Sequence, residues 1–278
     1  MINYNKKLFL IDVMPLLYRG HFVFLKKPRV TSTGLNTSAL TGFSNSLVQI
    51  LGEHSPTHLA LVFDSTTPTF RHKAYPEYKA QRPPPPEELI PQFPLIRDAV
   101  KAFNVASVEQ DGFEADDLIA TYVNDVIAKG GDVTIVSSDK DLMQLIQPGV
   151  DMLDPMKSER LGRQAVIEKF GVGPDRLGEV LGLMGDSADN VPGVPGLGPK
   201  TAAKLVQEFG TVDAVLAAAP EMKPSKMRDN LVAFAEQARL SRVLVELKCD
   251  ADLPEPLDDF LLKEVPEPPL RTFLEHHG

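Results

Sequence analysis

Two patterns of apolar and polar positions alternate along the first half of the chain. Short apolar runs at Leu8–Val13, His58–Phe63 and Asp132–Val136 predict buried strands, and Asn104–Val108 predicts a weaker one. The segments between them have helical periodicity, at 14–24, 37–54, 87–103, 114–129 and 139–146. Because strands that alternate with helices form parallel sheets covered on both faces, we expect an α/β fold with a mostly parallel central sheet flanked by helices.

The second half of the chain is patterned differently. After about residue 163 the spacing predicts short-looped helices, at 163–170, 174–184, 199–209, 211–219 and 225–247. The last residues are rich in proline and acids, which is typical of a loosely packed strap or linker. We therefore expect an α/β core over 1–162, a helical part over 163–249, and a strap or linker over 250–278.

A proline-rich segment interrupts the α/β pattern. Residues 65–86 combine threonine, tyrosine, basic residues and proline, and they end in Pro83–Pro86. Four consecutive prolines cannot continue a helix and favour extended backbone. This segment is predicted to protrude from the core.

Composition excludes several classes of protein. With 278 residues, 43% hydrophobic and 24% charged, the chain is too long for one small module and too apolar for a disordered protein. A single cysteine, Cys249, excludes a disulfide scaffold and a thiolate zinc cluster, and it fits a reducing cytoplasm. We find no run of about 18 apolar residues and no signal peptide, so we expect no membrane association.

The formal net charge of −9 argues against a nucleic-acid partner only if the charge is spread evenly. It is concentrated, because seven acids lie within residues 251–278 and nine others belong to the group described next. Without these acids the rest of the chain is basic, and basic residues crowd one segment: Arg71, His72, Lys73, Lys79 and Arg82. Such a run is either a solvated face or a nucleic-acid-binding surface, and charge alone does not decide.

Nine acids occur where strands end or helices begin. Asp12, Asp64 and Asp139 lie at the ends of predicted strands, where the strands of an open α/β sheet line a ligand crevice. The other six lie in first helical turns or in the segment GDSADN: Glu114, Asp116, Asp117, Asp141, Asp186 and Asp189. Each could instead be a cap or a favourable partner of a helix dipole. Two acids would suffice for capping at 114–117, yet this turn carries three, so the set as a whole favours a common site.

Electrostatic repulsion then determines what such a site must contain. Two carboxylates about 5 Å apart repel by about 3 kcal/mol at an effective dielectric constant near 20. Several such pairs would exceed the roughly 5–15 kcal/mol by which a fold is stable, so cations or protons must offset them. Oxygen ligands select hard ions such as Mg²⁺ or Mn²⁺, and so many acids favour two ions. Two ions about 3.5–4 Å apart carry out phosphodiester hydrolysis without a protein nucleophile.

Five segments give the chain a family resemblance. They are LFLIDVMPLLYRG, LALVFDSTTPTFRHKAYPEYKAQRPP, DGFEADDLIA, VSSDKDLMQLI and LMGDSADNVPGVPGLGPKTAAKLV. In this order they resemble the 5′-nuclease domain of bacterial DNA polymerase I, within the flap endonuclease family. The resemblance implies a PIN-like core and a bacterial, nucleoid-associated enzyme. The tail LRTFLEHHG is similar to the segment where such polymerases pass into the next domain, so a fused polymerase is expected.

The resemblance also implies roles for the acids. Asp12, Asp64, Glu114 and Asp116 would hold a first Mg²⁺ or Mn²⁺, and Asp139, Asp141, Asp186 and Asp189 would hold or orient a second. Asp117 would support the site, and Asp139 would lie between the two ions. One departure follows Asp12, where the family often has glycine and this chain has Val13.

For the basic segment the resemblance implies an arch, at about 65–90, through which a single-stranded 5′ end passes. Arg19, Lys79 and Arg82 match basic active-site residues, which would stabilise charge on the scissile phosphate. Tyr75 and Tyr78 either stack on an unpaired base or pack against the prolines. Arg71 and His72 are interpreted as DNA or phosphate contacts.

A glycine-rich turn lies near the centre of the helical part. The nine residues GVPGLGPKT do not form a nucleotide-binding P-loop, because Pro199 displaces the lysine and removes an N–H group. They resemble a helix–hairpin–helix over about 191–209, for which the family implies a bound K⁺. The expected phosphate contacts are Gly193, Gly196, Gly198, Lys200, Thr201 and Lys204. The alternative is a plain corner between two helices.

The sequence thus predicts a monomeric, two-metal 5′ nuclease that acts on DNA with 5′ flaps, nicks or 5′ ends. Two alternatives are a non-catalytic module that binds DNA junctions and a PIN-type single-strand RNase. Loss of carboxylates or of Lys79 would favour the first alternative, and none is missing. The hairpin and the residues beyond 163 speak against the second.

Overall fold

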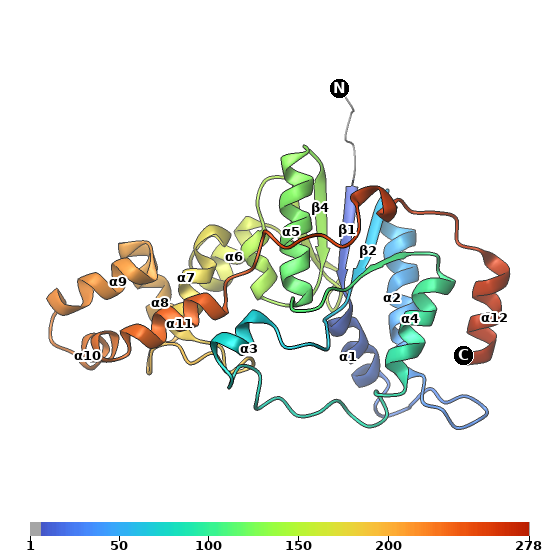
Figure 1. Ribbon diagram of the computed structural model, residues 1–278, viewed down its shortest axis with the longest axis horizontal. Coiled ribbons are helices and arrows are strands. Elements are labelled where there is room, and N and C mark those ends of the chain that lie inside the picture. The colour runs from blue at the N-terminus through green and yellow to red at the C-terminus, as the bar shows by residue number, and fades with distance from the viewer. Residues whose placement is uncertain (1–6, 278) are drawn as a thin grey trace.

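A computed structural model describes residues 7–277, and a six-stranded sheet forms its centre (Figure 1). Across the sheet the order is β3 (Ala106–Val108), β2 (His58–Val62), β1 (Lys7–Asp12), β4 (Asp132–Val136), β5 (Val150–Asp154) and β6 (Glu159–Leu161). Neighbouring strands are parallel except for β5 and β6. The expected mostly parallel sheet is confirmed, with β5 and β6 as strands that the apolar pattern missed.

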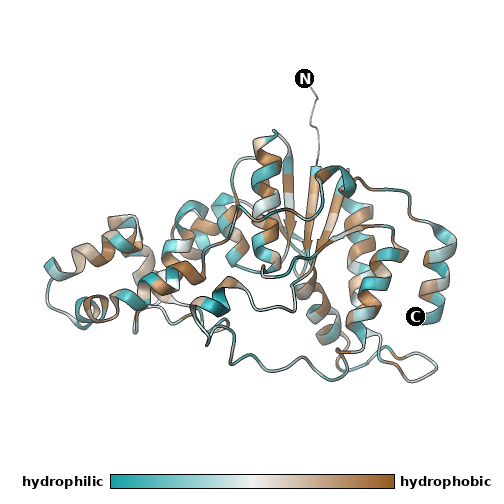
Figure 2. Cartoon of the chain, in the orientation of Figure 1, coloured by the Kyte–Doolittle hydropathy of each residue, from teal (hydrophilic) through white to brown (hydrophobic). Residues whose placement is uncertain are grey.

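The sheet separates two apolar cores because successive side chains of a strand point to opposite faces. In β1, Leu8 and Leu10 belong to one core, and Phe9 and Ile11 belong to the other. The first core includes α5 (Ala115–Ala128), and the second includes α1 (Val13–Val23), α2 (Ser38–His54) and α4 (Gln92–Ala102). Burial on both faces explains why these strands are continuously apolar (Figure 2).

Two glycines let α1 and α2 pack closely on the second face. A Cβ atom added to Gly42 would lie 2.3 Å from the Cα atom of Gly20, so neither position accepts a side chain without movement. The helix α1 begins at Val13, directly after Asp12, so the departure from the family pattern at this position leaves the strand-to-helix turn intact.

The helical part extends the first core away from the sheet. It contains α6 (Arg163–Phe170), α7 (Pro174–Met184), α8 (Pro199–Phe209), α9 (Val212–Ala218), α10 (Lys226–Ala233) and α11 (Ala235–Leu244). One apolar cluster contains Leu10 of β1 together with Leu177 of α7 and Ala238 of α11, so the two parts share a core. A single helix was predicted over 225–247, but the chain bends at Phe234, whose φ and ψ are −110° and 26°.

The C-terminal segment is more ordered than a loose strap. A short turn at Leu257–Phe260 buries Phe260, whose ring lies 4.9 Å from that of Tyr122. Beyond it, α12 (Glu267–His277) packs Leu270 and Phe273 against the core that contains α4. The prediction of a loose strap missed this helix, because its apolar residues are few.

Two other boundaries differ from the sequence-based expectation. The predicted helix at 139–146 is a 3-10 turn over Asp141–Leu145, and the predicted helix at 87–103 starts only at Gln92, after Pro91. Within residues 7–277, no helix combines the length and the apolar character needed to cross a bilayer.

Candidate active site

Three neighbouring strands bring acids to one edge of the sheet. Asp12 ends β1, and Asp64 and Asp139 follow β2 and β4, which lie on either side of β1. Because these strands are parallel, their carboxyl ends meet at one edge. Asp116 in the first turn of α5 and Asp141 after β4 join them. We call these five residues the inner acids: Asp12, Asp64, Asp116, Asp139 and Asp141.

The inner acids lie close enough to oppose one another's ionisation. Burial, together with the charge of Asp64, raises the pKa of Asp12 to about 8. Burial also raises the pKa of Asp141 to about 7, together with the charge of Asp139. Asp116 has a pKa raised well above its ordinary value, first by burial and then by the charges of Asp139 and Asp12. The strongest charges acting on Asp12 and Asp116 are therefore those of other acids.

Neutral donors orient the inner acids. Ser137 Oγ donates to Asp12 Oδ2 at 2.9 Å, and it accepts a hydrogen bond from the N–H of Asp139 at 3.0 Å. The N–H of Ala115 donates to Asp64 Oδ1 at 2.9 Å. Sequence reasoning missed Ser137, whose only signal is its place two residues before Asp139. Its hydroxyl fixes two acids without supplying charge.

The donor set fits a hard divalent cation. Asp141 Oδ1 is buried and has no hydrogen-bond partner, and Lys140 Nζ lies 3.7 Å from it, so this oxygen could accept a closer cation. Within residues 7–277, however, no three acidic, histidine or cysteine side chains are arranged as ligands of one ion. The acids are thus close enough to raise one another's pKa values, but their side chains would have to rotate to bind a shared ion. Oxygen-only side chains of this kind are typical ligands of hard divalent cations.

The three outer acids, Glu114, Asp186 and Asp189, are paired with cations of the protein. Lys79 Nζ lies 2.9 Å from Glu114 Oε1 and 3.7 Å from Asp189 Oδ2. Burial tends to raise the pKa of Asp189, but the charges of Lys79 and Arg82 outweigh it and lower that pKa. Lys140, which sequence reasoning also missed, pairs with Asp186. Cations of the protein thus pair with all three outer acids, whereas other acids exert the strongest charges on Asp12 and Asp116.

The basic segment crosses this edge of the sheet instead of protruding along its whole length. We call residues 70–82 the bridge, and it begins with α3 (Phe70–Ala74). The N–H of Lys79 donates to the carbonyl of Asp189 at 2.9 Å, and Asn190 Nδ2 donates to the carbonyl of Glu77 at 2.7 Å. Lys79 and Arg82 both reach Asp189, although Lys79 has a φ of 58° and is not helical.

Tyr78 is buried beside two of the outer acids. Its side chain is 4% exposed, and its hydroxyl lies 3.1 Å from both Glu114 Oε2 and Asp189 Oδ2. Its ring belongs to the first core and lies 5.3 Å from that of His72, edge to face. Tyr78 instead joins an acid of α5 to an acid of the α7–α8 loop.

Arg71, which was predicted to contact DNA, is also buried in this structure. Its side chain is 2% exposed, and it donates to both carboxylate oxygens of Asp117, at 2.7 and 2.8 Å. It also donates to the carbonyls of Leu244 and Glu246, at 2.8 and 2.7 Å. Asp117 accepts two further N–H groups, from Glu114 and Lys248. We call this pair the Arg71–Asp117 clamp, and it ties α3, α5 and the end of α11 together.

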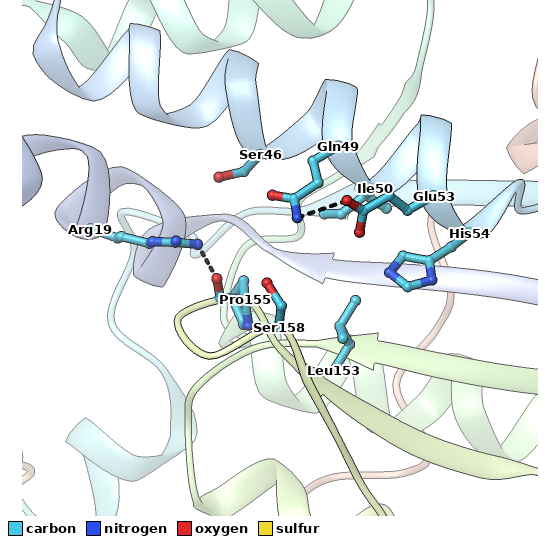
Figure 3. Close-up of a pocket in the computed structure, with 9 residues that line it drawn as sticks. All are labelled: Arg19, Ser46, Gln49, Ile50, Glu53, His54, Leu153, Pro155 and Ser158. Carbon is cyan, nitrogen blue, oxygen red and sulfur yellow. Dashed lines mark hydrogen bonds between the residues drawn. The ribbon is translucent and has the colours of Figure 1, made fainter.

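Three further predicted contacts lie in structural environments. His72 Nδ1 accepts from the N–H of Thr69, which caps α3, and Tyr75 is half-buried against the first core. Arg19 extends from α1 toward the turn after β5 and donates to the carbonyl of Pro155 (Figure 3). It lines a small pocket with Glu53 of α2, on the side of the second core.

The glycine-rich turn joins α7 to α8 next to the outer acids. Gly193 and Gly196 have φ values of 58° and 80°, and a Cβ atom on Gly193 would lie 2.3 Å from the N atom of Gly185. Gly198 caps α8, which begins with Pro199 and exposes Lys200 and Lys204. Thr201 lies in the same turn of α8, half-buried. The α7–α8 loop therefore carries two acids at one end and a tight turn with exposed lysines at the other.

Comparison with known proteins gives consistent results. The family description "5′-3′ exonuclease, N-terminal resolvase-like domain" matches residues 7–171, and "5′-3′ exonuclease, C-terminal SAM fold" matches residues 172–268. DNA polymerase I of Rhizobium leguminosarum is 48% identical over 275 residues, which cover 96% of this chain and 27% of that protein. A 5′-3′ exonuclease of Aquifex aeolicus is 37% identical over 93% of this chain and 87% of its own length. The chain thus spans about a quarter of that polymerase.

Solved structures share the fold. A zinc-bound T5 5′-exonuclease has a TM-score of 0.74 at 23% identity, covering 98% of this chain and all of the other. A bacteriophage T5 flap endonuclease in a pseudo-enzyme-product complex with DNA and metal ions has a TM-score of 0.72 at 23% identity, covering 98% and 99%. At this level of identity the likeness establishes the architecture.

Proposed function

This chain belongs to the 5′-3′ exonuclease family, and on that premise we propose that it is a structure-specific nuclease that hydrolyses DNA at 5′ ends, nicks and 5′ flaps. Such an activity would serve primer removal and repair. One observation carries the proposal: at the edge of the sheet, the charges that act most strongly on Asp12 and Asp116 are those of other acids. Protons or cations must offset such repulsion, and buried acids gathered at a strand-end crevice favour a cation site.

The proposed cofactors are two Mg²⁺ or Mn²⁺ ions. The first would be held by Asp12, Asp64, Glu114 and Asp116, and the second by Asp139, Asp141, Asp186 and Asp189. When bound, the ions would activate water and stabilise charge in an in-line displacement at phosphorus. Asp117 would contribute indirectly, because the clamp fixes the first turn of α5, from which Asp116 projects.

The chain's own residues would position the substrate. In this structure Lys79 and Arg82 neutralise outer acids, and they lie on the bridge across the site. When other cations neutralise those acids, both side chains become available to a phosphate. We propose that they stabilise the charge that develops on the scissile phosphate. Arg19 would contact a more distant phosphate, because it is directed toward Pro155.

We propose that the α7–α8 loop holds the duplex. The N–H groups near Gly196 and Gly198 lie at the start of α8, where helix geometry favours anions. Lys200 and Lys204 add charge to this surface, and such contacts carry no sequence information. We propose that the turn also binds a K⁺ ion.

The decisive experiment compares two substrates, a 5′-flapped DNA duplex and linear RNA, each with Mg²⁺ and with EDTA. We expect the purified chain with millimolar Mg²⁺ to cut a 5′-flapped DNA duplex, and to cut neither linear RNA nor, when EDTA is present, any substrate. Preferential cleavage of RNA would instead indicate a single-strand RNase. Tight binding to the flapped duplex without cleavage in Mg²⁺ or Mn²⁺ would indicate a non-catalytic junction-binding module.

Relatives named DNA polymerase I support a further proposal, that these residues act in a longer protein together with polymerase domains in the nucleoid. The shorter Aquifex exonuclease shows that family members of about this length also exist. An antibody against residues of α12 would distinguish the two in cell extracts by the mass of the protein detected.

A further inference from the structure

An apolar cleft lies beside the inner acids, between α1 and α4. Its volume is about 460 Å³, and its walls include Met14 and Leu17 of α1, Phe63 and Asp64 after β2, and Phe93 and Arg97 of α4. We propose that this cleft, named here the α1–α4 cleft, receives one unpaired nucleobase of the DNA strand that is cut. The proposal rests on the proposed nuclease function and assigns a new binding site to it.

The position of the cleft connects it to the reaction site. Asp64 is at once an inner acid and part of the cleft wall, so the two sites are contiguous. The chain leaves this wall at Ser65, crosses the site as the bridge, and returns at Gln92 where α4 begins (Figure 1). Both ends of the crossing segment therefore flank the cleft. A strand whose phosphate lies at the inner acids would place a neighbouring base at its mouth.

The walls have the chemistry of a stacking site. Phe93 and Arg97 are four residues apart on α4, so their side chains share one face of the helix. The Arg97 guanidinium lies 4.5 Å from the centre of the Phe63 ring, and Glu109 pairs with it from the side. Aromatic rings and guanidinium planes are the surfaces on which unpaired bases stack. Met14 and Leu17 close the opposite side with apolar surface.

The same walls argue for a base of any identity. Apolar groups predominate, and the carboxylate of Asp64 is already held by the N–H of Ala115. A cleft built in this way favours a flat, apolar face over a particular set of base edges. A volume of about 460 Å³ is also within the range of about 300–1,000 Å³ that is typical of small-ligand sites. Selectivity would thus be for an unpaired base rather than for sequence.

The test combines altered DNA with altered protein. A single abasic nucleotide is placed in turn at each of three positions on either side of the cleavage point of a 5′-flapped duplex. For the unaltered chain with Mg²⁺, we expect one position to lower the cleavage rate by roughly 5- to 150-fold, the range that corresponds to stacking of one base. The other positions should have little effect.

Variants then assign that loss to the cleft. Phe93→Leu keeps apolar bulk but removes the flat ring, and Phe93→Ala removes both. Each should lower cleavage of the intact flap and cause little further loss when the abasic nucleotide is at the sensitive position. Leu95→Ala, on the same helix but outside the cleft, is the matched control and should leave the full abasic effect. Melting temperatures identify any variant that fails to fold.

A binding measurement gives a second readout that does not depend on turnover. With 2-aminopurine at the sensitive position and EDTA present, we expect the chain to quench its fluorescence and Phe93→Leu to lose much of that quenching. If the chain cuts flaps but no abasic position matters, or if the Phe93 and abasic effects multiply, the cleft is not a base site although the nuclease proposal stands. If the unaltered chain cuts no flap, the nuclease proposal itself fails.

Discussion

Two adjacent residues at the start of α5, Asp116 and Asp117, lie in opposite electrostatic environments. Asp117 belongs to the Arg71–Asp117 clamp, and Asp116 belongs to the inner acids. Asp117 is fully buried, and its carboxylate accepts hydrogen bonds from both terminal nitrogens of Arg71 and from two backbone N–H groups. Asp116, one position earlier, faces the other inner acids, and its pKa is raised well above the ordinary value by burial and by their charges. Residues next to each other on a helix point about 100° apart, so one turn serves both regions.

The comparison shows how a fold can support an unfavourable site. A buried charge costs little when its hydrogen bonds and its counter-charge are complete, as at Asp117. The inner acids lack that completion, so they are stabilised by protons or by added cations instead. The Arg71–Asp117 clamp fixes the first turn of α5. It therefore holds Asp116 in place against repulsion from the other inner acids. Four experiments test the difference between Asp116 and Asp117.

The largest effect is expected from Asp116→Asn. Removing one oriented donor from an active site costs about 10²–10³-fold in rate, and a metal ligand should cost at least as much, so we expect cleavage to fall by more than about 10³-fold. The metal-free variant should nevertheless melt higher than the parent, because one repelling acid is gone. Asp125→Asn, on the exposed side of α5, is the matched control. A variant that cuts normally in saturating Mg²⁺ would remove Asp116 from the site.

Arg71→Met tests the other member of the comparison. Breaking a buried ion pair leaves an uncompensated charge, and we expect the free energy of unfolding to fall by about 3–5 kcal/mol in denaturant titrations. Lys129→Met breaks the solvent-accessible pair with Asp125 at the C-terminal end of α5 and should cost only about 0.3–0.5 kcal/mol. If the two variants are equally stable, the clamp does not have the structural role assigned to it.

The third experiment varies pH with and without metal. Folding raises the pKa of Asp12 from 3.8 to about 8, so the metal-free folded chain binds more protons than the unfolded chain between these values. Its contribution to stability therefore falls as pH rises through that window. Asp12→Asn should flatten the decline. A fixed Mg²⁺ concentration, 100 times the Kd measured at pH 8, should add about 2.7 kcal/mol at that pH. At the same concentration the gain in melting temperature should be smaller at pH 5, because the acids must release protons to bind the cation. A gain that is equal at both pH values would contradict the assigned pKa.

The smallest effect on function is expected from a surface lysine that belongs neither to the clamp nor to the inner acids. Lys200 is exposed at the start of α8, and Lys200→Gln should weaken duplex binding equally for different sequences. The slope of log affinity against log salt should decrease in magnitude by about 1. Lys157→Gln, between β5 and β6, should leave the slope unchanged. A loss confined to one DNA sequence would mean that the α7–α8 loop reads bases.

The sequence predicted the sheet and the strand-end acids because both follow from local patterns. Continuous apolar runs indicated β1, β2 and β4, and parallel pairing of these strands brings Asp12, Asp64 and Asp139 to one edge. The spacing of acids could not show that Asp116 and Asp117 belong to different environments, because that depends on a partner 46 residues away in the chain. The same holds for Arg71 and Tyr78, whose basic or aromatic character suggested surface contacts.

Elements with weak local signals were the ones missed. β6 has three residues, none of them fully buried, and it exists because β5 offers an edge. The break at Phe234 and the helix α12 likewise depend on packing against distant segments. The role of Lys140 was not predicted, because a single lysine between acids forms no recognisable sequence motif. Only the fold brings it to Asp186.

The α7–α8 loop has a consequence for where a cut would fall. The close approach of Gly185 and Gly193 pins Asp186 and Asp189 at a fixed offset from the turn that precedes α8. If that turn binds a DNA duplex, the distance from the bound duplex to the point of cleavage is fixed by the conformation of the loop. The enzyme would then measure from paired DNA, and the length of a loose 5′ end would not enter the measurement.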